Sequence, residues 1–499
     1  MKTPAIMVAV LGMATACADS PASSPAEWDG PTYEIQLTAD EPGVIHVAAM
    51  LPQTPARLQM SGNGAGQLSD GWATFVTDLR LTEEAGSPIG VERDGRNAWR
   101  VDEGSTGVVR LAYSIELAHD TVSWPGGIDG AALQLPWGAF FSGRAVFVVS
   151  EEATGPTRVV FGTSPEWDVA AAWPSVPGMS DVYEAPSPEA LTESYTFIGD
   201  HEGFTVERNG FELAFALGGP SVTARAAEFR SMAESVFDYY TTLLGGPPRP
   251  APGEPSERVL TIINEANVTD GEVIGSHINI LLEPDPDPMG QLFSQFGFTH
   301  ELFHLWNGKS IRSSGPEDWF TEGFTNYYAL KALHQAGKLD EASFLGVLGG
   351  MFYPRYVGDE GYGELSMREA VAIDKDGHWG LIYAGGLFAA VCQDVEIRTS
   401  TANRRSIDDV MRAMYERYAG SPDEFGVADV ERAIAGLSEH DPAAFFERHV
   451  IGTEPIPIEA CLSRVGLDAR VTDGQLQIAR PVDLGTDQAA MLAGMLGDR

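Results

Sequence analysis

Cysteine is scarce in this sequence, with only three residues among 499. So few cysteines exclude a disulfide-rich scaffold as the basis of the fold. Cys17 lies in the N-terminal leader region, which leaves Cys392 and Cys461 for the folded part. Cys392 follows the apolar run 386–391 and is interpreted as a core residue. A bridge between Cys392 and Cys461 in an oxidising compartment is the alternative interpretation.

Basic residues are also few. The sequence has 32 Lys and Arg residues against 71 Asp and Glu residues, so the net charge is -39. A surface this anionic repels a phosphate backbone, so nucleic acids are excluded as partners. The charge is interpreted as a solvated surface, with attraction of cationic peptides as the alternative. The hydrophobic content of 43% is that of a globular protein and excludes a wholly disordered chain.

Long apolar stretches are absent except near the N-terminus. Met1 and Lys2 form a short positive end, and the apolar stretch 5–16 follows it. This pattern is typical of a secretory signal and is too short to span a bilayer. We therefore expect residues 1–18 to be a signal peptide that exports the protein from a bacterial cytoplasm. No later stretch is predicted to cross a membrane.

Two modes of processing are compatible with the leader. Ala16, Cys17 and Ala18 fit removal of the leader before Asp19, whereas residues 14–17 resemble a bacterial lipobox in which Cys17 carries the lipid. Residues 19–32 are interpreted as a flexible tether, which favours the lipoprotein. We expect a periplasmic or outer-membrane lipoprotein, with free secretion as the alternative. Any membrane contact would then depend on a lipid anchor at Cys17.

The hydrophobic pattern changes twice along the chain. Residues 33–199 contain short alternating or apolar runs separated by turn residues, which predicts an all-β, sandwich-like domain. A helix is expected over 224–244, followed by strands 258–263 and 277–282 that bracket a glycine-containing loop. Helices dominate the next part, including 407–419, for which Ser406 is the expected N-cap, and 427–435. Weak strands and a terminal helix are expected after residue 450.

The decisive motif is His300-Glu301-Leu302-Phe303-His304. Two histidines four residues apart on a helix project from one face and can bind the same metal ion, with the glutamate beside it. Catalytic zinc needs a third protein ligand, and Glu322 is the best candidate because a short, turn-rich connection separates its predicted helix from the motif. Asn326, one turn later, either orients a histidine or is a plain surface or capping residue.

Two longer sequence segments resemble one family of peptidases. Residues 300–307 (HELFHLWN) and 319–328 (WFTEGFTNYY) are similar to the glycyl aminopeptidase family of gluzincins, relatives of thermolysin. Residues 394–398 (DVEIR) and 404–418 (RRSIDDVMRAMYERY) extend the resemblance. It implies an α+β protein with an N-terminal β domain, a thermolysin-like catalytic domain over 200–335, a helical domain over 336–450 that completes the active site, and a C-terminal segment over 451–499.

The resemblance also implies roles for single residues. His300, His304 and Glu322 would bind Zn²⁺, Glu301 would be the general base, and Tyr383 would stabilise the tetrahedral intermediate. The residues alone favour a packed core tyrosine at this position over a catalytic one. Glu272, in the glycine-containing segment 271–277, is the candidate to bind the substrate amine, with an exposed loop acid as the alternative.

The sequence therefore predicts a zinc-dependent peptidase that hydrolyses peptide bonds with a metal-activated water and is expected to be an aminopeptidase. An endopeptidase of the same clan is one alternative. A non-enzymatic peptide-binding protein on a peptidase scaffold is the other. Peptides are the expected partners, and the sequence gives no signal for an oligomeric state.

Overall fold

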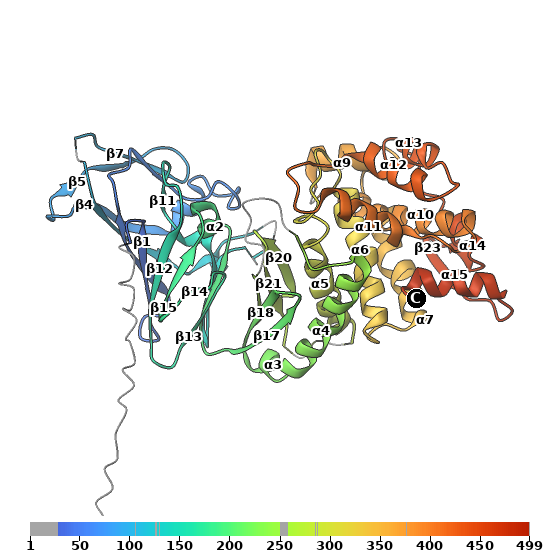
Figure 1. Cartoon of the computed structure of the whole chain (residues 1–499), viewed down its shortest axis with the longest axis horizontal. Coiled ribbons are helices and arrows are strands. Elements are labelled where there is room, and N and C mark those ends of the chain that lie inside the picture. The colour runs from blue at the N-terminus through green and yellow to red at the C-terminus, as the bar shows by residue number, and fades with distance from the viewer. Residues whose placement is uncertain are drawn as a thin grey trace, which may run out of the picture.

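The structure is a computed structural model that describes residues 28–104, 106–124, 127–128, 130–249, 258–284, 286, 288–375 and 377–498. The predicted signal peptide, Cys17 and most of the predicted tether lie outside these residues. Along the longest axis of the molecule, a β-rich N-terminal part is followed by a sheet in the middle and by helices at the C-terminal end (Figure 1). The fold is therefore α+β, as the sequence predicts.

The N-terminal part is built on a large sheet with the strand order β14-β15-β12-β1-β2-β8-β4-β5. Buried and exposed residues alternate along its strands, so one face lies on the core and the other faces solvent. Its strands are β1 (Thr32–Leu37), β2 (Val44–Leu51), β4 (Val76–Glu83), β5 (Pro88–Ile89), β8 (Val109–Glu116), β12 (Thr157–Thr163), β14 (Ser175–Val176) and β15 (Met179–Ala185).

Two smaller sheets and short helices complete this part. One sheet has the order β13-β16-β10-β9 and the other the order β11-β3-β7-β6. Trp173 and Trp99 are buried in the shared core. The elements are β3 (Arg57–Gln59), η1 (Gly71–Phe75), β6 (Val91–Arg93), β7 (Ala98–Val101), η2 (His119–Thr121), β9 (Ala132–Leu135), β10 (Gly138–Ser142), α1 (Gly143–Val146), β11 (Val149–Ser150), β13 (Asp168–Ala171), α2 (Pro188–Thr192) and β16 (Tyr195–Gly199).

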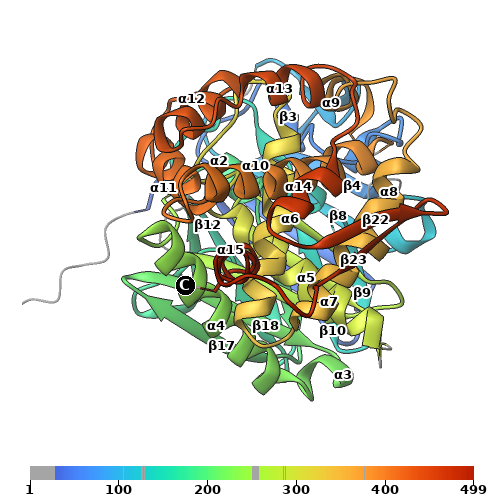
Figure 2. The same cartoon turned by 90° about the vertical axis from the view of Figure 1, so that its right-hand side faces the viewer.

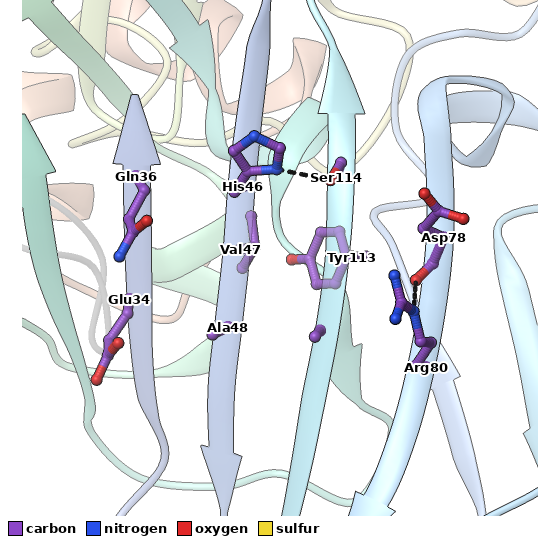
Figure 3. Close-up of a pocket in the computed structure, with 10 residues that line it drawn as sticks. Glu34, Gln36, His46, Val47, Ala48, Asp78, Arg80, Tyr113 and Ser114 are labelled. Carbon is purple, nitrogen blue, oxygen red and sulfur yellow. Dashed lines mark hydrogen bonds between the residues drawn. The ribbon is translucent and has the colours of Figure 1, made fainter. Parts of the chain in front are cut away.

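The solvent face of the large sheet carries polar side chains around a shallow hollow of about 260 Å³ (Figure 3). His46 on β2 lies beside Ser114 on β8, with 2.9 Å between the imidazole Nδ1 and the hydroxyl oxygen. Glu34, Gln36 and Arg80 line the same hollow. No residue of the motif 300–304 lines it.

The middle sheet has the order β17-β18-β19-β21-β20 and places β20 at one edge. Its strands are β17 (Glu202–Arg208), β18 (Phe211–Gly218), β19 (Arg258–Glu265), β20 (Asp270–Ile274) and β21 (His277–Leu282). The predicted strands over 258–263 and 277–282 are confirmed as β19 and β21. The loop predicted between them is wrong in its central part, because Asp270–Ile274 pairs antiparallel with β21.

Helices α3 (Pro220–Thr223) and α4 (Ala226–Leu244) follow β18, which confirms the helix predicted over 224–244. Helix α4 ends at Gly245, whose φ of 80° lies in the left-handed region that glycine adopts without strain. Buried residues recur along α4 at helical spacing and pack into the core that the middle sheet shares with the later helices.

The remaining chain is mostly helical, with α6 and α10 at its centre (Figure 2). Helix α11 begins after Ser406, whose hydroxyl accepts a hydrogen bond from the Asp408 backbone N–H, so the predicted N-cap is confirmed. The elements are α5 (Pro288–His304), α6 (Asp318–Gln335), α7 (Glu341–Val347), η3 (Leu348–Phe352), α8 (Tyr353–Val357), α9 (Met367–Asp374), η4 (Gly380–Gly385), α10 (Gly386–Ser400), α11 (Ile407–Tyr418), α12 (Val427–Leu437), α13 (Ala443–His449), α14 (Ile458–Arg464), β22 (Asp468–Thr472), β23 (Gln475–Ala479) and α15 (Thr486–Leu496).

The continuous helical stretch formed by η4 and α10 is long and apolar enough to cross a membrane, contrary to the sequence-based expectation. However, 89% of its most apolar window is buried inside the protein, as expected of a core helix. Cys392 on α10 forms a disulfide with Cys461 on α14. The bridge was the alternative interpretation, and the structure shows it.

Candidate metal centre and active site

The last turn of α5 brings His300 and His304 to one face, because residues four apart lie one above the other on a helix. Between them, Leu302 and Phe303 are buried in the core and fix the rotation of the helix. The two imidazole Nε2 atoms lie 3.0 Å apart. Helix α6 packs against α5 and places Glu322 opposite the pair, with its Oε2 3.3 Å from His300 Nε2 and 3.2 Å from His304 Nε2.

These three side chains form a set of donors that could hold a metal ion, since all ligand atoms lie within 4.8 Å of one another. Two imidazole nitrogens and one carboxylate oxygen match the protein ligands of catalytic zinc sites. The side chains of His300 and Glu322 are each only 9% exposed, so a charge between them would be poorly solvated. The expected convergence of His300, His304 and Glu322 is therefore present.

The partner that orients a histidine is Asn307 rather than Asn326. His304 Nδ1 donates to the Asn307 carbonyl oxygen at 3.0 Å, which leaves Nε2, the atom that faces Glu322, as the possible metal ligand. Asn326 lies one turn beyond Glu322 on α6, but its amide donates to the Tyr383 carbonyl oxygen at 3.2 Å. Asn326 thus ties α6 to η4, and the prediction that it orients a histidine is wrong.

Lys375, which follows α9, was not predicted from the sequence. Its Nζ lies 2.7 Å from Glu322 Oε1 and 2.8 Å from Asp318 Oδ1. The two oxygens of Glu322 therefore have separate partners, with Oε2 facing the histidines and Oε1 facing the lysine. No sequence signal links Lys375 to Glu322, because they lie 53 residues apart and meet only in the folded chain.

Charge within the cluster shifts two pKa values in opposite directions. Burial would raise the pKa of Glu322, but His304, His300 and Lys375 outweigh it and hold that pKa well below its usual value. Burial is the largest influence on Glu301 and raises the pKa of its carboxyl. Glu322 is thus kept as a carboxylate that can bind a cation, while Glu301 becomes a better proton acceptor.

Glu301 opens onto a cleft of about 960 Å³ together with His300, His304 and Glu322. Strand β20 runs along the same cleft, and a Cβ atom added at Gly271 would lie 3.8 Å from Glu301 Cγ. The free edge of β20 therefore passes beside the predicted base. Other residues that line the cleft are Asp270, Glu272, Val273, Phe296, Lys309, Arg312, Asp318, Thr321, Asn326, Lys375, Trp379, Tyr383 and Glu424.

Tyr383 lines the cleft from η4, as the resemblance implies, and its side chain is only partly buried. Its ring stacks on Trp379 with a centroid distance of 5.1 Å and lies 6.3 Å from the ring of His300. The alternative of a fully packed core tyrosine is therefore wrong.

The helical segments that carry Glu322 and Tyr383 approach each other closely at a pair of glycines. A Cβ atom added at Gly323 on α6 would collide with the backbone of Gly386, and one added at Gly386 would lie 2.9 Å from Gly323 Cα. The two backbones are thus in direct contact at the residue after Glu322 and three residues after Tyr383.

Glu272 lies on β20 with its side chain directed toward the N-terminal part. Its Oε1 is 3.5 Å from Nη1 of Arg144, and Arg144 also forms a hydrogen-bonded ion pair with Glu193. Burial raises the pKa of the Glu272 carboxyl, Arg144 opposes this shift, and Glu301 and Glu193 raise the pKa further. Glu272 therefore belongs to a strand at the cleft, whereas the sequence placed it in a loop.

Comparisons with known proteins agree with this geometry. The model of the peptidase M61 N-terminal domain matches residues 32–200, and the model of the M61 glycyl aminopeptidases matches residues 296–375. No curated protein matches the chain. A solved structure of an aminopeptidase N family protein from Idiomarina loihiensis is similar in fold, with a TM-score of 0.74 and 17% identity over 88% of this chain and 79% of that chain. Both models describe parts of one family, so residues 32–200 and 296–375 of this chain match the M61 glycyl aminopeptidases, and the residues of the matched motif meet in one cleft.

Proposed function

We propose that this protein is a zinc-dependent aminopeptidase. The observation that carries the proposal is the convergence of His300, His304 and Glu322 beside Glu301 in an open cleft. The family match supports peptidase activity, and the donor set supports zinc as the ion. A pure binding protein would have no need for a buried base beside such ligands.

His300, His304 and Glu322 would hold a zinc ion, which when bound would supply a water of near-neutral pKa and polarise the peptide carbonyl. Glu301 accepts the proton of the attacking water and returns it to the leaving amine. The hydroxyl of Tyr383 donates a hydrogen bond to the oxyanion that develops on the peptide carbonyl. Asn307 and Lys375 hold His304 and Glu322 in place through the contacts described above.

The charges around β20 support cleavage at a free N-terminus. Glu193 and Glu272 share a single guanidinium, that of Arg144, so negative charge remains at this end of the cleft. The Ile128 backbone N–H donates to Asp270 at 3.1 Å, which brings the N-terminal part against β20. We infer that Glu272 binds the ammonium of the substrate and that the N-terminal part limits how far a peptide extends beyond it.

Metal content and a pair of substrates test the proposal. The purified protein is expected to bind about one zinc per chain, to lose activity on chelation and to regain it with zinc. A dipeptide with a free amine should be cleaved, while its N-acetylated counterpart should not. Cleavage of both would indicate an endopeptidase, and a folded protein without zinc-restorable activity would refute the peptidase.

We also propose that the chain is exported and anchored through Cys17. The disulfide between Cys392 and Cys461 supports export, since such bonds persist in oxidising compartments. Cys17→Ser should release the protein from the membrane fraction if a lipid on that residue is the anchor. Unchanged fractionation, with a mature N-terminus at Asp19, would instead favour free secretion.

A further inference from the structure

The solvent face of the large N-terminal sheet holds a second candidate site. The hollow drawn in Figure 3 continues into a neighbouring hollow of about 450 Å³. Among the described residues, none that lines either hollow also lines the active-site cleft. The two hollows therefore form one depression that is separate from the metal centre. The residues that line both hollows are Glu34, Ala48, Arg80 and Ala112.

Strand register places these four side chains in one line across the sheet. Glu34 on β1 pairs with Ala48 on β2, and Ala48 pairs with Ala112 on β8. Ala112 pairs in turn with Arg80 on β4. Residues that are paired across neighbouring strands point to the same face of a sheet. The line therefore consists of an acid, two methyl groups and a base, and it runs across the four strands.

Larger side chains stand on both sides of this line. On one side His46 pairs with Ser114, and a hydrogen bond joins their side chains. On the other side Met50 pairs with Arg110. Because the two alanines are shorter than these neighbours, they form the floor of a groove that crosses the strands between two ridges. We call this depression the transverse groove.

The two ends of the transverse groove carry opposite charges that the protein does not pair. In the part of the chain that the structure describes, Glu34, Arg80 and Arg110 take part in no ion pair. Arg80 Nε donates to the Asp78 carbonyl oxygen over a long 3.4 Å. Arg110 lies diagonally next to Arg80, because it pairs with Thr82 on β4. One carboxylate at the β1 end thus faces two guanidinium groups at the β4 end, on a chain whose net charge is -39.

These charges favour a ligand that has both signs of charge at a defined separation. Neighbouring strands lie about 4.8 Å apart, so β1 and β4 are about 14 Å apart across the groove. An extended peptide advances about 3.3–3.6 Å per residue, so about four residues span this distance. The ammonium and phosphate of a lipid headgroup are too close together to reach both ends. A sugar would find no ring to stack on, since the aromatic lining residue, Tyr113, is only 3% exposed.

We propose that the transverse groove binds a peptide of about four residues with free ends. Its ammonium pairs with Glu34, and its carboxylate pairs with Arg80 and Arg110 through charge-assisted hydrogen bonds. No residue of the metal centre contributes, so this binding does not depend on the proposed function. Short peptides with free ends are also substrates and products of a peptidase, and the groove would hold them on the enzyme without cleaving them.

Photo-crosslinking tests the groove directly. The probe is an alanine tetrapeptide with free ends and the diazirine amino acid photoleucine at its second position. It is irradiated with full-length, zinc-loaded protein that carries Glu301→Gln, so that the probe is not hydrolysed. Mass spectrometry then identifies the crosslinked residues. We expect crosslinks within 46–50 and 110–114, and crosslinks in the cleft are counted separately.

Two substitutions and a blocked probe sharpen the test. Ala112→Leu fills the floor with a side chain that points to solvent, and Arg80→Gln removes a charge from one end. Each should lower crosslinking in the groove at least about tenfold and leave crosslinking in the cleft unchanged, and the N-acetylated, C-amidated probe should show the same loss in the groove. Arg100→Gln is the matched control, because Arg100 is an exposed strand arginine that does not line the groove. It should match the protein without this substitution.

The outcomes separate the groove from the active site. Crosslinks in the cleft with none in the groove would overturn the groove and leave the peptidase intact. Groove crosslinks that survive both Arg80→Gln and blocking of the ends would overturn the recognition of free ends. Groove crosslinks that depend on the ends and on Arg80, with none in the cleft, would support the groove and count against peptide binding at the metal centre.

Discussion

Helix α6 carries two polar clusters that differ in how their charges are used. At its N-terminal end, Asp318 and Glu322 face the cleft, where Lys375 and the two histidines meet them. Further along, Tyr327, Tyr328 and Lys331 face the interior and bond to other helices: Lys331 to Asp408 at 2.6 Å, Tyr328 to Asp408 at 3.0 Å and Tyr327 to Asp394 at 2.8 Å.

The groups of the interior cluster bond to one another and to nearby backbone carbonyl groups. Arg398 on α10 binds Asp394 at 3.0 Å, and the carbonyl oxygens of Gly494 and Met495 on α15 accept from Arg398 and Tyr327. In the cleft cluster, by contrast, two imidazole nitrogens and one carboxylate oxygen point at the same small space. A network whose groups bond to one another stabilises the fold, while donors that converge on one point are arranged for a ligand. Substitutions in the cleft cluster should therefore lower activity or metal affinity, whereas substitutions in the interior cluster should lower the free energy of unfolding.

Glu301→Gln should have the largest effect, because it keeps the size of the side chain but removes the base. We expect turnover to fall by about 10²–10⁴-fold, with zinc content and the free energy of unfolding close to those of the wild type. Peptide hydrolysis and metal analysis measure these quantities, and Glu416→Gln on the surface is the control. Wild-type turnover in Glu301→Gln would contradict the mechanism.

Arg398→Met should show the opposite pattern. It leaves the Asp394 carboxylate buried without its guanidinium, so we expect the free energy of unfolding to fall by about 3–5 kcal/mol. Zinc affinity and turnover per folded molecule should stay unchanged. Urea unfolding provides the measurement, and Arg432→Met, which removes an exposed ion pair with Asp429, should cost less than about 1 kcal/mol. Equal costs for both variants would show that the interior cluster is not a stabilising network.

Tyr383→Phe removes one hydroxyl from the cleft and leaves the stacked ring in place. We expect a loss of about 2–4 kcal/mol of transition-state stabilisation, seen mainly in kcat and not in KM. Steady-state kinetics on a free-amine dipeptide measures it. An unchanged kcat would remove Tyr383 from the mechanism without affecting the roles of the other residues.

Lys375→Met should have the smallest effect of the four. Without the lysine, Glu322 can rotate away from the histidines, so we expect zinc affinity to weaken by about 10–100-fold. Competition with a chelator measures the affinity, Lys375→Arg should recover part of it, and Lys338→Met removes a similar charge elsewhere as a control. Tighter zinc binding in Lys375→Met would mean that the lysine only repels the ion.

The sequence predicts the cleft cluster in part, and the physical reason is spacing. His300 and His304 are four residues apart, and a short connection limits where Glu322 can lie, so local geometry is sufficient. Lys375, Arg144 and Glu193 escaped prediction because tertiary packing alone brings them to the site. Asn326 was given the wrong partner because the position of η4 beside α6 cannot be deduced from either segment.

For the fold as well, local sequence patterns predict some elements and tertiary contacts determine the others. Strong periodicity revealed α4 and α11, whereas β20 was missed because the run Asp270–Ile274 combines glycine with acidic residues and lacks alternation. Its pairing with β21 stabilises it as a strand. The disulfide likewise joins cysteines 69 residues apart. At that separation the sequence spacing does not show whether the two side chains meet.

The contact between Gly323 and Gly386 has a consequence for how such an enzyme can change. The gap between the metal-binding helix and the tyrosine is set by two backbones in contact, so no rotamer change at either position can widen or narrow it. Any change in this spacing therefore requires the helix backbones themselves to move.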